Sequence, residues 1–265
     1  MTSERPHRPH AIVGSGAAVG VLGGLIGLGG AEFRLPLLIG LFGFGALEAV
    51  ILNKAMSLVV VAVALPLRMW SVPLDAVAER WDIIATLAAG SLAGAWFGAG
   101  WATKIKSRTL YRVLAVLLVG IAVVLVAGHG ARAMGQPLLQ GAALAAVGVC
   151  AGFGIGVVAA LMGVAGGELL IPTIVLLFGA DMKLAGSLAL AVSLPTMIVA
   201  FARYSQDASF AVVRAQRRFI VLMALGSLAG VFAGSLLLGV IPTVVLLPLL
   251  AIILLASAVK VWRHG

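Results

Sequence analysis

The stretch GLIGLGGAEFRLP, at residues 24–36, decides the fold, because a related stretch, ALMGVAGGELLIP, follows at residues 160–172. The two align with a constant offset of 136 residues, which pairs Glu32 with Glu168 and proline with proline. The register continues without a gap well beyond the quoted stretches. Chance would rarely place two glutamates at equivalent positions of two apolar segments. We therefore interpret the chain as two copies of one structural unit.

The composition indicates an integral membrane protein. Hydrophobic residues make up 62% of the 265 residues and charged residues only 10%, with a mean hydropathy of +1.19. A soluble domain carries about a quarter charged residues, so this chain lacks the polar surface that water requires. The formal net charge of +9 is better explained by cations in cytoplasmic loops than by nucleic-acid binding.

Apolar runs of helix length predict an all-α membrane fold of about eight long helices and two short arms. The short arms, at residues 34–45 and 169–179, each follow a glycine-rich break and contain a proline near the start. Neither can span a bilayer, since spanning takes about 20 residues, so each is expected to be the return arm of a broken-helix hairpin. The long runs lie at residues 11–31, 48–67, 83–102, 110–127, 138–164, 184–202, 219–238 and 242–261.

The number of crossings predicts that the second unit is inverted relative to the first. Each unit has a hairpin, which makes an even number of passages, followed by three transmembrane helices, as in secondary transporters built from inverted-topology repeats. With both termini in the cytoplasm, 12 of the 18 lysines and arginines fall in cytoplasmic segments, in agreement with the positive-inside rule. The expected parts are a cytoplasmic tail (1–10), a first repeat (11–130), an extracytoplasmic linker (131–136) and a second repeat (137–265).

Two cations at membrane depth, Lys54 and Arg34, are the strongest candidates for an anion-binding site. A charged side chain inside a membrane is costly and normally faces a cavity or a partner. The N-termini of the short arms would add backbone N–H groups and the positive ends of helix dipoles. The other candidate substrate ligands are glycine or polar residues at or near the breaks: Asn53, Gly29, Gly30, Gly166, Gly167, Ser57, Ser187 and Ser193.

Each of these features also has a structural interpretation. Lys54 could instead neutralise a glutamate at position 32, 48 or 168, the glycines could only pack helices together, and the serines could bond back to their own helix carbonyls. Two roles are open for Glu32 and Glu168. They could exchange a proton and couple transport to the proton gradient, or they could hold the breaks by pairing with a cation or accepting backbone N–H bonds.

No catalytic or cofactor-binding set stands out. The single cysteine, Cys150, excludes an intrachain disulfide and a multi-cysteine metal site. The four histidines lie in tails and loops, and the sequence contains no phosphate-binding loop that would indicate an ATPase. We therefore expect neither an enzyme nor a resident cofactor or metal.

The duplicated glycine-rich segment with its downstream proline, each copy followed by a short arm and a serine-bearing helix, resembles the TauE/SafE sulfite exporter family over about residues 11–260. The resemblance implies a multi-pass transporter of sulfite, organosulfonates or related sulfur compounds in the bacterial inner membrane. The first repeat departs from the family's pattern, since it has VILNK at residues 50–54 where the second has a Gly186-Ser187 step. The added lysine favours an anion, one that is larger or more highly charged.

The expected function is therefore secondary transport of a sulfur oxyanion or organosulfonate, such as sulfite or sulfoacetate, by alternating access. The expected partners are a small anionic substrate and membrane lipid, with proton or ion coupling as an option and no nucleic acid. An anion channel and a transporter of another small anion are the alternatives. The sequence leaves the direction of transport, the coupling ion and the oligomeric state open.

Overall fold

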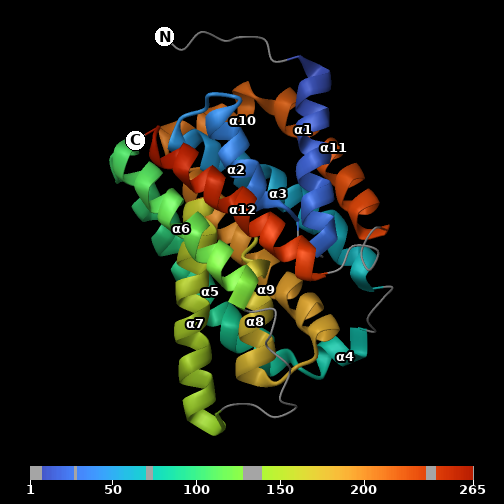
Figure 1. Ribbon diagram of the computed structural model, residues 1–265. Helices are drawn as coiled ribbons and strands as arrows, with labels where there is room; N and C mark the ends of the chain where they lie inside the picture. Colours follow the sequence, from blue (N-terminus) through green and yellow to red (C-terminus); the bar gives the residue numbers. More distant parts are fainter. Residues whose placement is uncertain (1–7, 27–28, 70–73, 128–138, 237–242, 265) are drawn as a thin grey trace.

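The described part of the protein is helical throughout (Figure 1). The computed structural model describes residues 8–26, 29–69, 74–127, 139–236 and 243–264, and no strand occurs in these ranges. The all-helical fold expected from the sequence is confirmed, whereas the expected linker at 131–136 lies outside the described residues. The helices are α1 (Pro9–Ile26), α2 (Ala31–Gly40), α3 (Ala46–Met69), α4 (Leu74–Ala78), α5 (Trp81–Ala102), α6 (Ser107–Ala127), α7 (Gly141–Met162), α8 (Gly167–Phe178), α9 (Met182–Tyr204), the 3₁₀ turn η2 (Ala208–Phe210), α10 (Ala211–Ala215), α11 (Arg217–Leu236) and α12 (Thr243–Trp262).

Among the described residues, six helices are long and apolar enough to cross a membrane: α3, α5, α6, α7, α9 and α11. Three others, α1, α8 and α12, contain apolar stretches of 10–17 residues. Large apolar side chains such as Val116, Val123 and Phe232 are also exposed on the outside of these helices, as expected of helices that face lipid. The chain is therefore a multi-pass membrane protein.

Helices α2 and α8 occupy the positions of the two short arms, and they begin earlier than the apolar runs predict. α2 has 10 residues and α8 has 12, which corresponds to a length of about 15–18 Å. The apolar runs predict starts at residues 34 and 169, but the helices begin directly after Gly30 and Gly166. The acidic residue of each motif thereby joins the first helical turn, where the helix dipole favours a negative charge.

The helix boundaries follow the sequence offset. α2 and α8, α3 and α9, α5 and α11, and α6 and α12 each begin 136 residues apart, and α1 and α7 end 136 residues apart. The inter-helix contacts follow it as well. α1 packs along α11, and the equivalent helices α7 and α5 pack along each other, so each long arm lies beside a helix of the other half of the chain.

Glycines bring these helix pairs into close backbone contact. A Cβ atom at Gly20 of α1 would overlap the backbone of Ser227 on α11, and one at Gly156 of α7 would overlap the backbone of Ser91 on α5. The two contacts are equivalent under the 136-residue offset. Small residues at every fourth position allow this approach in membrane helices, where packing and not the hydrophobic effect drives association.

Leucine at position 156 should therefore destabilise the protein. Its Cβ would overlap the backbone carbonyl of Ser91, which can yield only if α5 and α7 separate, and overpacking of this kind costs about 1–3 kcal/mol. Gly154→Leu is the matched control, because nothing lies within 4 Å of a Cβ at that position of the same helix. In thermal unfolding of purified protein, Gly156→Leu should lower Tm by several degrees and Gly154→Leu should not. Equal Tm values would contradict the close α5–α7 contact.

Candidate functional site

The two short helices begin at glycines in the left-handed backbone region. Gly30, before α2, has a φ of 67°, and Gly166, before α8, has a φ of 84°. Residues with a Cβ rarely adopt this conformation, so glycine is needed at both breaks. Gly29 lies directly before the first of these turns, and Gly167 is the first residue of α8. The four predicted site glycines thus lie at the starts of the two short helices, and Gly30 and Gly166 provide the left-handed turns there.

Arg34, on α2, is completely buried and bonded to three neutral side chains. Its Nε donates to Asn53 Oδ1 at 2.8 Å, and its Nη2 donates to Ser57 Oγ at 2.8 Å. Its Nη1 donates to Ser227 Oγ on α11 at 3.3 Å. The guanidinium therefore joins α2 to α3 and to the second half of the chain, and it forms no ion pair with a glutamate of the described ranges.

Asn53, on α3, connects the two helix breaks. Its carbonyl oxygen accepts from Arg34, and its amide nitrogen donates to the backbone carbonyls of Ala31 and Met162, at 3.0 Å each. Ala31 is the first residue of α2 and Met162 is the last residue of α7. One buried amide thus ties the start of the short helix in one half to the end of the long helix in the other.

Lys54 is fully buried at the C-terminal end of α7. Its Nζ donates to the backbone carbonyls of Ala159 at 2.8 Å and Val164 at 2.6 Å. Ala159 lies in the last turn of α7 and Val164 two residues beyond its end, and the carbonyls at a helix C-terminus carry the negative end of the helix dipole, which a cation stabilises. Among the described residues Lys54 makes no ion pair, although the charge of Glu168 acts on it through space.

Glu32 and Glu168 are buried, at 1% and 9% exposed, and interact electrostatically with each other. Both carboxylate oxygens of Glu32 and Oε2 of Glu168 have no hydrogen-bond partner among the described residues. The carboxyl group of Glu32 also lies within electrostatic range of Arg34. The two carboxyl groups therefore lie within interaction range of each other, and that of Glu32 also lies within range of Arg34, which is compatible with either role considered for them, proton coupling or holding the breaks.

The three predicted serines differ in their surroundings. Ser57 accepts from Arg34, whereas Ser187 and Ser193 on α9 are buried and their hydroxyl groups have no hydrogen-bond partner among the described residues. The expectation that such serines bond back to their own helix carbonyls is thus not met at Ser187 or Ser193. Ser193 is equivalent to Ser57 under the 136-residue offset, but the position equivalent to Arg34 is Leu170. The second half therefore has the hydroxyl group without its guanidinium.

Two further residues belong to this region and were not predicted. Ser227 accepts from Arg34, and the buried Tyr204 donates its hydroxyl to the carbonyl of Ala160, near the end of α7, at 3.0 Å. Ser227 is equivalent to Ser91 under the offset. This repeated serine is the sequence feature from which Ser227 could have been predicted. Tyr204 gave no comparable signal, because the position equivalent to it, residue 68, is an arginine.

Together these contacts define a buried polar cluster where the two helix breaks meet, which we call the central cluster. It contains two cations, two carboxyl groups, one amide and two hydroxyl groups, so its formal charges can balance. Neither cation is exposed to solvent, and the cluster is closed in this conformation. Its members are Glu32, Arg34, Asn53, Lys54, Ser57, Glu168 and Ser227.

Comparison with known proteins assigns the chain to a family. The family described as "Sulfite exporter TauE/SafE" matches residues 12–261, which is nearly the whole chain. No curated protein and no solved structure matches significantly. The family match, the multi-pass helical fold and the buried charged cluster at the two breaks agree with one another. The chain belongs to the TauE/SafE sulfite exporter family, whose members are membrane transporters of small sulfur anions.

Proposed function

We propose that this protein is a secondary transporter that moves a sulfur oxyanion or organosulfonate, such as sulfite or sulfoacetate, across the bacterial inner membrane by alternating access. The observation that carries the proposal is the central cluster, in which Arg34 and Lys54 are completely buried at the meeting point of two helix breaks. Intramembrane charges are expensive and mark substrate or ion pathways. The family match supports a sulfur anion as the substrate.

The proposed architecture consists of two inverted-topology repeats with both termini in the cytoplasm. The shared helix starts and the equivalent pairs α1–α11 and α5–α7 support the repeat. In Figure 1, α1 begins and α12 ends at the same end of the molecule as α10, while α4 lies at the opposite end. The segments at the end that holds α10 and the two termini carry most of the lysines and arginines, which supports a cytoplasmic location for that end.

Reporter fusions should read the topology directly. We expect a fusion at residue 107 and one at residue 210 to report the cytoplasm, and one at residue 133 to report the external side. The reason is that three crossings and one hairpin separate the N-terminus from the middle of the chain. An external signal at 107 or 210, or an internal signal at 133, would contradict the inverted repeat.

In the proposed binding step, the anion replaces neutral partners of Arg34. The guanidinium now donates to one amide oxygen and two hydroxyl oxygens. An anionic oxygen is a stronger acceptor than a neutral one, so a sulfite or sulfonate oxygen would gain two or more of these bonds when the cluster opens. The hydroxyl groups of Ser187 and Ser193, which have no hydrogen-bond partner in the part of the chain that the structure describes, are the additional donors that we propose for a tetrahedral anion.

The charge balance of the cluster also supports proton coupling. Two cations and two carboxylates sum to zero, so an entering anion leaves an excess negative charge in a low-dielectric site. Uptake of one proton by the pair Glu32 and Glu168 would cancel that excess. The two carboxyl groups already interact with each other, and three of their four oxygens have no hydrogen-bond partner among the described residues. We propose that this pair carries the coupling proton.

Binding is tested by calorimetric titration of the purified protein with sulfite, sulfoacetate, taurine, thiosulfate and sulfate. We expect one or more of the anions to bind, and taurine, which has no net charge, to bind least. Equal affinity for taurine and sulfoacetate would contradict an anion site, and a lack of binding by all five compounds would contradict the proposed substrate class.

Coupling is tested by flux into proteoliposomes with an imposed pH gradient. The wild-type protein should accumulate the anion that binds best, and Glu32→Gln should exchange it without accumulation. Glu79→Gln removes an equal charge from an exposed glutamate and is the matched control. If Glu32→Gln accumulates the anion to the wild-type level, Glu32 does not carry the coupling proton and its role is structural.

An anion channel remains the second candidate, because a buried anion site can also line a pore. The closed central cluster favours a transporter, since neither Arg34 nor Lys54 reaches solvent in this conformation. Flux that saturates with anion concentration supports alternating access, and flux that rises without limit supports the channel.

A further inference from the structure

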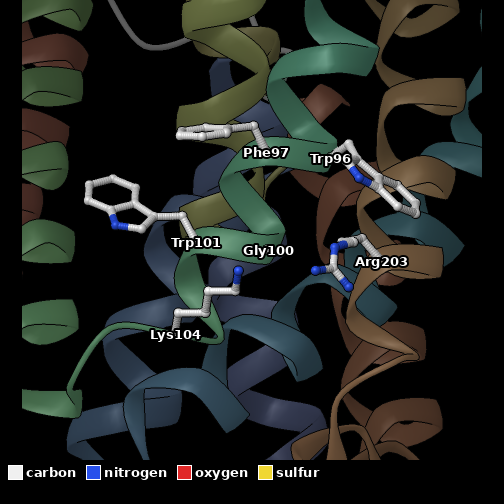
Figure 2. A pocket seen from close by; sticks show the side chains of 6 residues that line it. All are labelled: Trp96, Phe97, Gly100, Trp101, Lys104 and Arg203. Carbon is white, nitrogen blue, oxygen red and sulfur yellow. The ribbon is translucent and has the colours of Figure 1, made fainter.

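A groove of about 310 Å³ lies on the outer face of α5, away from the central cluster. Figure 2 shows its lining: Trp96, Phe97 and Trp101 project from α5, Lys104 follows in the next turn, and Arg203 comes from the end of α9. The three aromatic side chains are between 40% and 57% exposed. A membrane protein presents such side chains to lipid, with aromatic rings near the interface.

Gly100 lines the groove between the two cations, and its lack of a side chain leaves room for Arg203. A Cβ atom at this position would lie 3.0 Å from Nε of Arg203, so the guanidinium lies directly over the glycine backbone. Figure 2 shows Lys104 and Arg203 on either side of Gly100, with their charged ends turned toward it. Arg203 also stacks on Trp96, with its Cζ atom 5.3 Å from the ring centroid. The stacked ring holds the guanidinium in place.

The two cations of this groove have no anionic partner in the described part of the chain. Arg203 donates to the neutral side chain of Gln206, and the one ion pair among the described residues joins Arg80 to Asp82. Two positive charges beside exposed apolar rings form a surface that matches a ligand with a negative head and an apolar body. A phospholipid with a net negative charge has this composition, and basic pockets between transmembrane helices bind such headgroups.

The two cations of this groove are not shared by the two halves of the chain. Under the 136-residue offset, Lys104 corresponds to Val240 and Arg203 to Leu67, so the sequence of the other half lacks both cations. The feature therefore belongs to one leaflet only. In the proposed topology this is the cytoplasmic leaflet, next to the turn at residues 103–106.

We propose that this groove is a specific binding site for one anionic phospholipid. The headgroup phosphate lies between Lys104 and Arg203, and an acyl chain runs along the exposed faces of Phe97 and Trp101. The neighbouring Phe153 of α7, whose ring centroid is 6.1 Å from that of Phe97, extends this apolar surface. The bound lipid joins α5 to α9 on the outside of the protein.

Native mass spectrometry of the full-length protein in detergent tests the site by titration with phosphatidylglycerol and with phosphatidylcholine of the same acyl chains. We expect phosphatidylglycerol to bind more tightly to the wild type. The double variant Lys104→Gln/Arg203→Gln should lose about 30-fold in affinity, since each near-surface cation contributes about fivefold. Lys106→Gln/Arg217→Gln removes two exposed cations outside the groove and should bind like the wild type.

A single variant tests the site if the double variant is unstable, and inorganic phosphate tests whether the ligand is a lipid or a soluble anion. Lys104→Glu changes one exposed side chain, and it should weaken phosphatidylglycerol binding and leave phosphatidylcholine binding unchanged, even if the double variant is unstable. Inorganic phosphate at millimolar concentration should not displace the lipid. The proposal is overturned by equal binding of both lipids to the wild type, by equal losses in the groove and control double variants, or by displacement with inorganic phosphate, which would indicate a soluble anion.

Discussion

Replacing Arg34 by glutamine should weaken binding of the transported anion by about tenfold to a hundredfold, because hydrogen bonds to a charged group contribute about 1.5–3 kcal/mol. Within the described part of the chain the guanidinium has no carboxylate partner at hydrogen-bond distance, and its three acceptors are neutral oxygens. Its charge is therefore available to an anion. A glutamine can still bond to Asn53 or Ser57, so the variant removes the charge while keeping part of the local network.

The measurement is calorimetric affinity together with Tm on the same preparation. Arg108→Gln is the matched control, since it removes an equal charge from an exposed position at the start of α6. We expect the control to keep the wild-type affinity. If Arg34→Gln binds the anion as well as the control does, the guanidinium is not a substrate ligand and serves only to connect α2, α3 and α11.

The breaks and the buried cations could be predicted because they leave local signals in the sequence. Glycines beside a glutamate and a proline, repeated at a constant offset, identify the starts of α2 and α8 to within three residues. Lys54 and Arg34 are conspicuous because charged residues are rare in apolar runs. These predictions depend only on neighbouring residues and on the internal repeat.

The partners of these residues could not be predicted, because they come from distant parts of the chain. Ser227 lies 193 residues from Arg34, and nothing near either residue indicates the contact. The sequence suggested a glutamate as the structural partner of Lys54, whereas its hydrogen bonds go to main-chain carbonyls at the end of α7. Carbonyl acceptors are present at every residue, so only the three-dimensional arrangement selects Ala159 and Val164.

The position of Lys54 combines two roles that a single and a double variant together can separate. Its ammonium group donates to the carbonyls of Ala159, in the last turn of α7, and of Val164, just beyond that helix, and its charge acts on Glu168. It also lies next to Asn53, which bonds to Arg34, and so adds positive potential to the proposed anion site. The first role concerns stability, and the second concerns affinity.

Lys54→Met should lower both Tm and anion affinity. The methionine has a similar length but no donor, so two buried carbonyls lose a charged partner and Glu168 loses a compensating charge, at a cost of about 3–5 kcal/mol. Adding Glu168→Gln should restore part of the lost Tm, because the uncompensated carboxylate is then removed. Affinity should stay low in the double variant, since the positive potential is still missing. A lowered Tm with wild-type affinity would confine Lys54 to holding the end of α7, and an unchanged Tm would contradict its bonds to the two carbonyls.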